Sequence, residues 1–138
     1  MYLKCRLKKN LNEKVAPGAK ELVFELEQKC YIKQLAIAIF MNNTTGTHDS
    51  RLIIKIDEDE VLNEDLRLLR LHYCGGITSP NLHNFLECVR YDDTNKNYSF
   101  IFTNFSRVDR RLAIFFENKD TTNTAWVHIG VIYDILED

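Results

Sequence analysis

The sequence predicts an all-β fold in which two antiparallel sheets pack face to face. Apolar residues recur at every second position in several segments, which is the period of a strand with one buried face. These segments are rich in β-branched and aromatic residues, and short stretches with Asn, Asp, Thr, Pro or Gly separate them. Helices do not alternate with the strands, so a parallel sheet covered by helices is not expected.

The first two predicted strands flank a turn. Residues 2–7 alternate, with Leu3, Cys5 and Leu7 on one face and basic residues on the other. The Pro17-Gly18 pair is a strong turn signal. In residues 21–27, apolar side chains alternate with glutamate, so this strand should have one face in the core and one in water. Its expected buried residues are Leu22, Phe24 and Leu26.

Residues 31–41 are apolar on both faces over most of their length, which predicts a central strand. One face carries Ala36 and Ala38, and these small side chains indicate that another layer packs closely against that face. Polar residues 42–50 connect this strand to residues 51–57, and the two segments together predict a hairpin.

Residues 57–76 fit a short helix better than a strand. Their apolar residues approximate a helical stripe, and Asn63, followed by two acidic residues, would cap such a helix. The alternative is a strand over residues 66–73. Ser79 and Pro80 are typical of a second helix start, although the alternation that follows them favours a strand.

The last part of the chain predicts two further hairpins. Residues 85–91 pair with residues 98–104, and residues 111–118 pair with residues 124–134 across a Lys-Asp-Thr-Thr-Asn turn. Altogether we expect about eight strands with one or two short helices, in a single domain over residues 1–138. Two packed sheets or a barrel would hold these strands. An antiparallel β-sandwich of jelly-roll type fits this strand count in a chain of this length.

Composition and charge exclude several classes of function. Apolar residues make up 45% of the chain and charged residues 28%, which is typical of a globular domain with its own core. Lys and Arg number 18 against 20 Asp and Glu, so nucleic acid is not an expected partner. No apolar run approaches the ~20 residues that span a bilayer, and the N-terminus lacks the apolar region of a signal peptide. We therefore expect a cytoplasmic protein, unless the chain leaves the cell in an assembled particle.

The four cysteines are too sparse for a disulfide framework. Cys5 and Cys30 lie within strand-like patterns, so we expect both to be buried thiols. Cys74 and Cys88 would pair only in an oxidising setting, and the sequence leaves this question open.

No motif in the sequence predicts an enzyme or a cofactor. There is no nucleophile motif and no Gly-rich phosphate loop. The acidic residues 57–60 fit no EF-hand loop and are better explained as a solvated turn than as a Ca²⁺ site. His128 should share a strand face with Trp126 and Gly130, which predicts a half-buried or interface histidine. Four residues have suitable ligand atoms for zinc but match the spacing of no zinc module: His72, Cys74, His83 and Cys88.

Aromatic and basic residues are the candidate contact sites. Tyr and Trp favour protein interfaces, and they also stack on sugar rings. Trp126, beside the last turn, is the preferred anchor. The basic N-terminal strand would complement the acidic C-terminus of a neighbouring subunit. The candidate interface or ligand residues are Trp126, Tyr91, Tyr133, Tyr2, Lys4 and Arg6.

Three stretches carry patterns that occur together in one class of protein. In residues 15–24 a Pro-Gly turn leads into a strand, and residues 52–57 form an apolar strand that ends in Asp. Residues 112–118 form a strand that ends in Asn, and residues 131–134 close the last strand on Tyr-Asp. The whole chain thereby resembles the single jelly-roll proteins of virus particles, namely capsid, vertex, turret and spike subunits. The resemblance implies a structural role in a virion, with contacts to neighbouring copies and no catalytic site.

The leading hypothesis is a non-enzymatic assembly subunit that associates with its own copies or with other structural subunits. The alternative is a carbohydrate- or other ligand-binding module that uses the loops at residues 42–50, 74–80 and 118–124. A third hypothesis is a metal-assisted hydrolase that uses His72 and His83.

Overall fold

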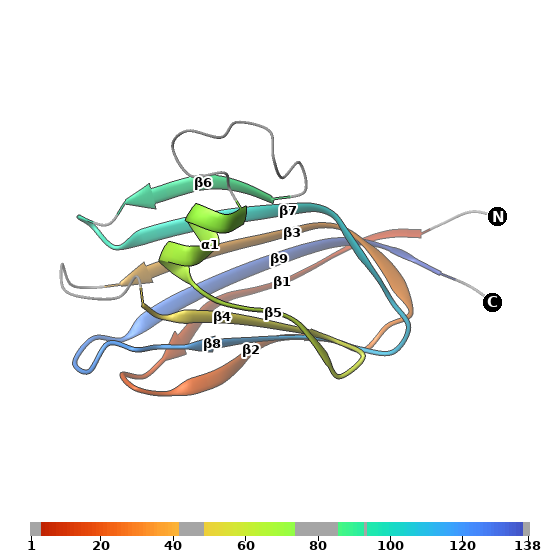
Figure 1. Ribbon diagram of the computed structural model, residues 1–138. Helices are drawn as coiled ribbons and strands as arrows, with labels where there is room; N and C mark the ends of the chain where they lie inside the picture. The colour runs from red at the N-terminus through yellow and green to blue at the C-terminus, as the bar shows by residue number, and fades with distance from the viewer. Residues whose placement is uncertain (1–3, 42–48, 74–85, 93, 137–138) are drawn as a thin grey trace.

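The computed structural model describes residues 4–41, 49–73, 86–92 and 94–136, and shows two antiparallel sheets stacked face to face (Figure 1). The five-stranded sheet has the order β1 (Lys4–Val15), β9 (Ala125–Ile135), β3 (Cys30–Met41), β7 (Asn97–Val108) and β6 (Leu86–Asp92). The four-stranded sheet has the order β2 (Lys20–Leu26), β8 (Leu112–Glu117), β4 (Arg51–Ile56) and β5 (Asp59–Asp65). One helix, α1 (Leu66–Tyr73), lies within these residues.

The strand order is that of a jelly roll. The chain forms a long antiparallel ribbon that turns back between β4 and β5, so that β4 pairs with β5, β3 with β7, β2 with β8 and β1 with β9. The ribbon is rolled up so that successive pairs lie in opposite sheets, and β6 adds one strand at the edge beside β7. This confirms the predicted all-β sandwich of jelly-roll type with about eight strands and a short helix.

Two of the three predicted hairpins are wrong. The segments 31–41 and 51–57 form β3 and β4, and the segments 111–118 and 124–134 form β8 and β9, but each pair is divided between the two sheets. The error has a physical cause: a period of two shows that a strand has a buried face but does not show which strand lies beside it. The third predicted hairpin, β6–β7, is confirmed.

The core lies between the two sheets. As predicted, β3 is a central strand that buries Leu35, Ile37 and Ile39 on its inner face. Burial of each such side chain contributes about 1.5–3 kcal/mol relative to exposure. Cys30 is buried as expected, and its burial, with the charge of Asp57 as a smaller cause, raises the pKa of the thiol to about 11. The largest fully buried side chains include Tyr98, Phe24, Phe100, Phe102 and Phe116.

Strand β1 has its faces reversed relative to the prediction. Cys5 is exposed rather than buried, and Leu7 is 63% exposed. The polar face instead points toward β2, where Lys8 Nζ donates to the carbonyl of Glu25 (2.6 Å) and Asn10 Nδ2 donates to the carbonyl of Val23 (2.7 Å). Among the strands that the structure describes, β2 is the edge of its sheet, so these carbonyls have no strand partner there on that side and need other donors.

Strand β2 also differs from the predicted pattern. A bulge between Leu22 and Phe24 shifts its pairing with β8 by one residue. Val23 and Phe24 are therefore both buried, whereas Leu22, which the alternation placed in the core, is 39% exposed. The turn that leads into β2 is as predicted: the N–H of Ala19 donates to the carbonyl of Ala16 (3.0 Å), and Gly18 has the positive φ of 73° that a type II turn requires.

The predicted helix exists but begins later than expected. Residues 59–65 form β5, which pairs with β4, and α1 follows over residues 66–73. The N-terminal cap is Asp65 rather than Asn63, since Asp65 Oδ1 accepts from the N–H of Leu68 (2.7 Å). The amide oxygen of Asn63 accepts instead from Arg51 Nε (2.8 Å) across the β4–β5 pair.

The loop between β8 and β9 crosses from one sheet to the other and is fixed by side-chain hydrogen bonds. Asn118 is fully buried, and its Nδ2 donates to the carbonyls of Val15 (3.0 Å) and Asn123 (2.8 Å). Its Oδ1 accepts from the N–H of Asp120 (3.0 Å). The carboxylate of Asp120 accepts in turn from the N–H groups of Thr122 (2.8 Å) and Asn123 (2.9 Å). The loop thus satisfies its buried polar groups internally.

Asn118→Ala is expected to lower the free energy of unfolding by about 2–4 kcal/mol, because it leaves two carbonyls and one N–H without their partner at a buried site. Urea unfolding followed by circular dichroism measures the change. Thr121→Ala, an exposed position in the same loop, is the control and should stay within about 0.5 kcal/mol of the parent. Equal stabilities of the two variants would contradict the role given to Asn118.

Candidate functional site

The outer faces of the two sheets differ in character. On the four-stranded sheet, Lys20 and Arg51 lie on either side of Glu117 in adjacent strands, which gives a row of alternating charge. The ammonium groups of Lys20 and Lys55 each lie 5.5 Å from the centre of the Phe115 ring. Ile53 points to the same face, yet it is only 3% exposed. Charged side chains therefore close this face.

The outer face of the five-stranded sheet is open and apolar. At its centre, Ala36 lies opposite Gly130 on one side and Ile101 on the other. In the next row, Ala38 lies opposite His128 and Ser99. The small side chains leave a shallow, open hollow of about 290 Å³, which we call the outer hollow, and its remaining lining includes Leu11 and Val89.

Large apolar side chains surround the outer hollow. Leu11 is 52% exposed and Val89 is 55% exposed, while Leu7 and Phe40 are exposed on the same face. An antiparallel sheet that faces water normally carries polar residues on that side. A continuous apolar face with polar residues at its rim is typical of a contact surface. The outer face of the five-stranded sheet is therefore the candidate functional site.

The structure places the predicted contact residues in several environments. Trp126 lies on the outer face beside Phe40, with Lys14 Nζ 4.8 Å from the centre of its ring. Arg6 is exposed on β1, and Lys4 begins the same strand. Tyr133 is buried in the core. Tyr91 is half-buried and makes an edge contact with Tyr98, with 4.9 Å between the ring centres. Tyr2 lies outside the described residues.

Sequence reasoning missed the residues that form the outer hollow. Ala36 and Ala38 were expected to lie under a second layer, but no element that the structure describes covers them. The available signal was the failure of alternation: β3 and β9 carry Ala, Gly, Phe and Trp where a wet face would carry charged residues. Small residues on a second apolar face indicate close approach by some partner, which need not belong to the same chain.

His128 is held in the outer face as a half-buried residue. Its Nδ1 accepts from the N–H of Asn12 (3.2 Å), at the point where a bulge interrupts the pairing of β1 with β9. Its ring lies edge-on to Phe40, with 5.2 Å between the ring centres. Among the residues that the structure describes, no three His, Cys, Asp or Glu side chains form a group that could hold a metal ion. The side chains of the proposed zinc set lie outside the described residues.

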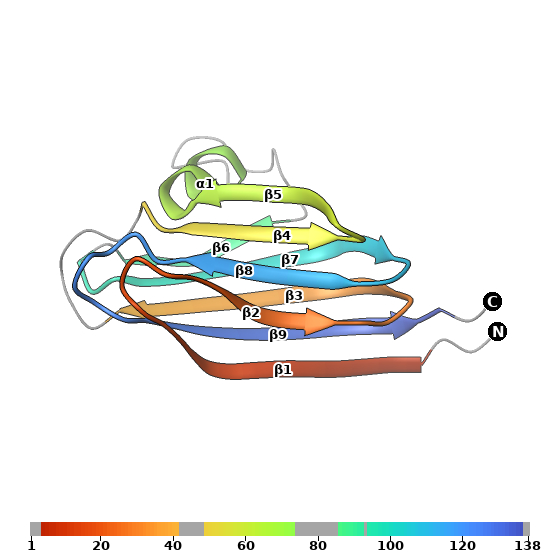
Figure 2. The ribbon, with the colours of Figure 1, turned by 90° about the horizontal axis from the view of Figure 1, so that it is seen from below.

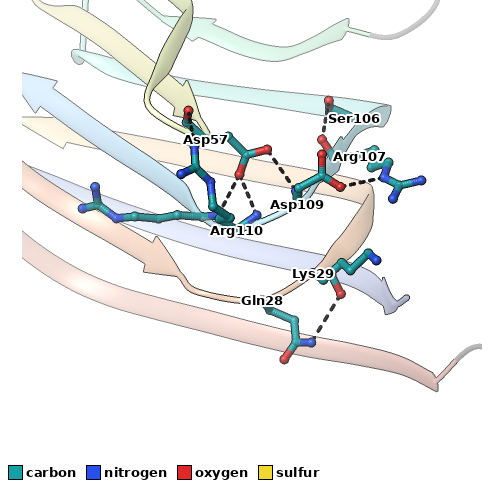
Figure 3. A network of polar contacts seen from close by, with 8 residues as sticks. Gln28, Lys29, Asp57, Ser106, Arg107, Asp109 and Arg110 are labelled. Carbon is teal, nitrogen blue, oxygen red and sulfur yellow. Dashed lines mark hydrogen bonds and ion pairs between the residues drawn. The ribbon is translucent and has the colours of Figure 1, made fainter. Parts of the chain in front are cut away.

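Of the acidic residues 57–60, the first two form the tight turn between β4 and β5 and the last two begin β5, and Asp57 binds the protein's own backbone (Figure 3). Both turn residues have positive φ, 51° at Asp57 and 71° at Glu58, as a two-residue hairpin turn requires. The Asp57 carboxylate accepts from the N–H groups of Asp109 (3.0 Å), Arg110 (2.7 Å) and Arg111 (2.9 Å). The Asp57 carboxylate thus accepts hydrogen bonds from the backbone of the connection between β7 and β8.

The hydrogen bonds to Asp57 change its titration. Burial acts to raise the pKa of its carboxyl group, but the backbone N–H groups of Arg111, Asp109 and Arg110 outweigh burial and hold the pKa below its ordinary value. Folding therefore favours the charged carboxylate. The resulting stabilisation is complete above the unfolded-state pKa and is lost as the pH falls through the folded-state pKa.

Of the three loops proposed for ligand binding, the structure describes the loop 118–124 completely. In the loop 118–124, the side chains of Asn118, Asp120 and Asn123 already bond to the loop itself or to β1. The loop 74–80 and most of the loop 42–50 lie outside the described residues. The described loop therefore offers few polar groups for a sugar.

The chain matches no protein-family model, and no curated protein shows significant similarity to it. The eight residues of α1 fall far short of a membrane-spanning helix, and the described part of the chain holds no other candidate span.

Asp57→Asn is expected to lower the free energy of unfolding at neutral pH by about 1–3 kcal/mol, because three N–H groups lose a charged acceptor. Asn tolerates the positive φ of this turn, so the loss reports on charge rather than on backbone strain. The difference from the parent should shrink as the pH falls below about 4. Chemical denaturation over a pH series measures it, with the exposed Glu60→Gln as control. A difference that persists unchanged in acid would contradict this assignment.

Proposed function

We propose that this protein is a non-enzymatic structural subunit, of the kind that single jelly-roll proteins provide in virus particles, and that it works by self-association. The observation that carries the proposal is the open apolar face around the outer hollow. Removal of such a face from water is favourable by roughly 25 cal/mol per Å². The jelly-roll strand order and the resemblance to virion subunits support the same function.

The size of this face fits a stable contact. Five strands at about 4.8 Å spacing and about eleven residues in length cover about 900 Å². A standard protein interface takes about 800 Å² from each partner. The outer face is thus large enough to form most of one interface.

The charges at the rims of this face favour a second copy of the chain as the partner. On the β1 side, Lys9 and Lys14 point to the outer face, which gives a charge of +2. On the β6 side, Glu87, Arg90 and Asp92 sum to −1. A two-fold axis parallel to the strands would place β1 of one copy over β6 of the other, so that opposite charges meet. A two-fold axis across the strands would place lysine against lysine.

Leu11→Glu is expected to weaken self-association at least about tenfold, because it places a charge in the apolar lining of the outer hollow. Mass photometry and sedimentation equilibrium of the purified chain measure the dissociation constant. Leu22→Glu is the matched control, since it makes the same change at an exposed leucine of the other sheet. It should leave self-association unchanged.

A chain that stays monomeric at high concentration, both alone and when co-expressed with its neighbouring gene products, would contradict the proposed function. Equal effects of Leu11→Glu and Leu22→Glu would contradict the assignment of the contact to the outer face.

A further inference from the structure

We infer that subunits also join head to tail, with the basic edge of β1 on one copy against the acidic edge of β5 on the next. This inference rests on the proposed function, since it names a second contact between copies. The seven residues 4–10 of β1, which precede its bulge, carry four basic residues and no acidic residue: Lys4, Arg6, Lys8 and Lys9. The seven residues of β5 carry four acidic residues and no basic residue: Asp59, Glu60, Glu64 and Asp65. The two edges therefore have formal charges of +4 and −4.

Both strands lie at the edge of a sheet. Among the described strands, β1 pairs only with β9, and β5 pairs only with β4. An edge strand presents backbone N–H and C=O groups that a strand from another molecule can pair with. Arg6, Lys9, Asp59 and Glu60 are exposed, whereas Asp65 is buried and caps α1. The first half of β5 is thus the accessible part of the acidic edge.

The two edges lie on opposite flanks of the sandwich (Figure 2). Strand β1 lies beside β2 on one flank, and β5 lies beside α1, which also contacts β6, on the other. One molecule can therefore offer β1 to one neighbour and β5 to another at the same time. A contact of this kind repeats from copy to copy, and it produces a closed ring or an open filament.

Charge decides which edges meet. A β1–β1 contact would place basic residues opposite basic residues, and a β5–β5 contact would place acidic residues opposite acidic residues; both arrangements are unfavourable. Only the β1–β5 contact brings opposite charges together. Such pairs contribute to selectivity and to the rate of encounter more than to affinity. The head-to-tail contact uses the strand edges and the two-fold contact uses the outer face, so one subunit can make both.

A charge-exchange experiment tests this inference. One variant carries Lys4→Glu and Arg6→Glu, and the other carries Asp59→Lys and Glu60→Lys. Each variant alone should lose assembly beyond the dimer at low salt, with a dissociation constant raised at least about tenfold. An equal mixture should regain assembly, because the reversed β1 of the first variant fits the reversed β5 of the second. Mass photometry and sedimentation velocity give the distribution of species.

The control carries Arg107→Glu and Lys119→Glu, which lower the net charge by the same four units as the first variant at two other exposed positions and should leave the distribution unchanged. If either variant alone assembles like the parent, or if the mixture does not recover, the head-to-tail inference is overturned. A parent dimer that Leu11→Glu disrupts would then still support the proposed function. A parent chain that is monomeric under all conditions overturns both.

Discussion

The structure depends on the burial of one apolar face of each sheet against the other. Most successive strands belong to opposite sheets, β4–β5 and β6–β7 being the exceptions, so the chain crosses the edge of the core repeatedly. Each crossing brings backbone polar groups near apolar side chains. Asn118 and Asp57 meet this requirement at opposite ends of β8. Each uses one short side chain to bond several backbone groups of a neighbouring connection. The sandwich is therefore held at its ends by hydrogen bonds and along its length by apolar packing.

The asymmetry between the two outer faces links the fold to the proposed function. On the four-stranded sheet, long basic side chains lie over Phe115 and beside carboxylates, so that apolar surface is covered from within the chain. On the five-stranded sheet, the corresponding positions hold alanine and glycine, which cannot cover their neighbours. A partner that fills this face would complete a third layer. Assembly would then extend the same sheet-on-sheet packing that forms the core.

The fold class could be predicted because apolar residues recur at every second position in the strands. Most strands lie at the residues where this alternation predicted them. Strand partners could not be predicted, since alternation in β8 and β9 carries no information about which sheet each joins. The reversed faces of β1 could not be predicted either. The alternation puts Leu7 and Lys8 on opposite faces of the strand, but which face turns inward depends on the nearby carbonyls of β2, to which Lys8 donates. Within the candidate site, Trp126 was singled out as an aromatic residue beside the last turn, and the structure places it on the outer face. The alanines of β3 were misinterpreted because small residues show that something approaches closely without showing what.

The position of β9 has a consequence for synthesis of the chain. Strand β9, the last of the described strands to be synthesised, inserts between β1 and β3, so the five-stranded sheet cannot close until β9 has been made. Until then, β1 has no partner strand and β3 has an open side, and the pairing of β1 with β9 spans more than a hundred residues. Nascent chains are most exposed to mispairing during this interval. The lysines of β1 would place like charges opposite each other if this strand paired with the same strand of another unfinished chain, which opposes such mispairing.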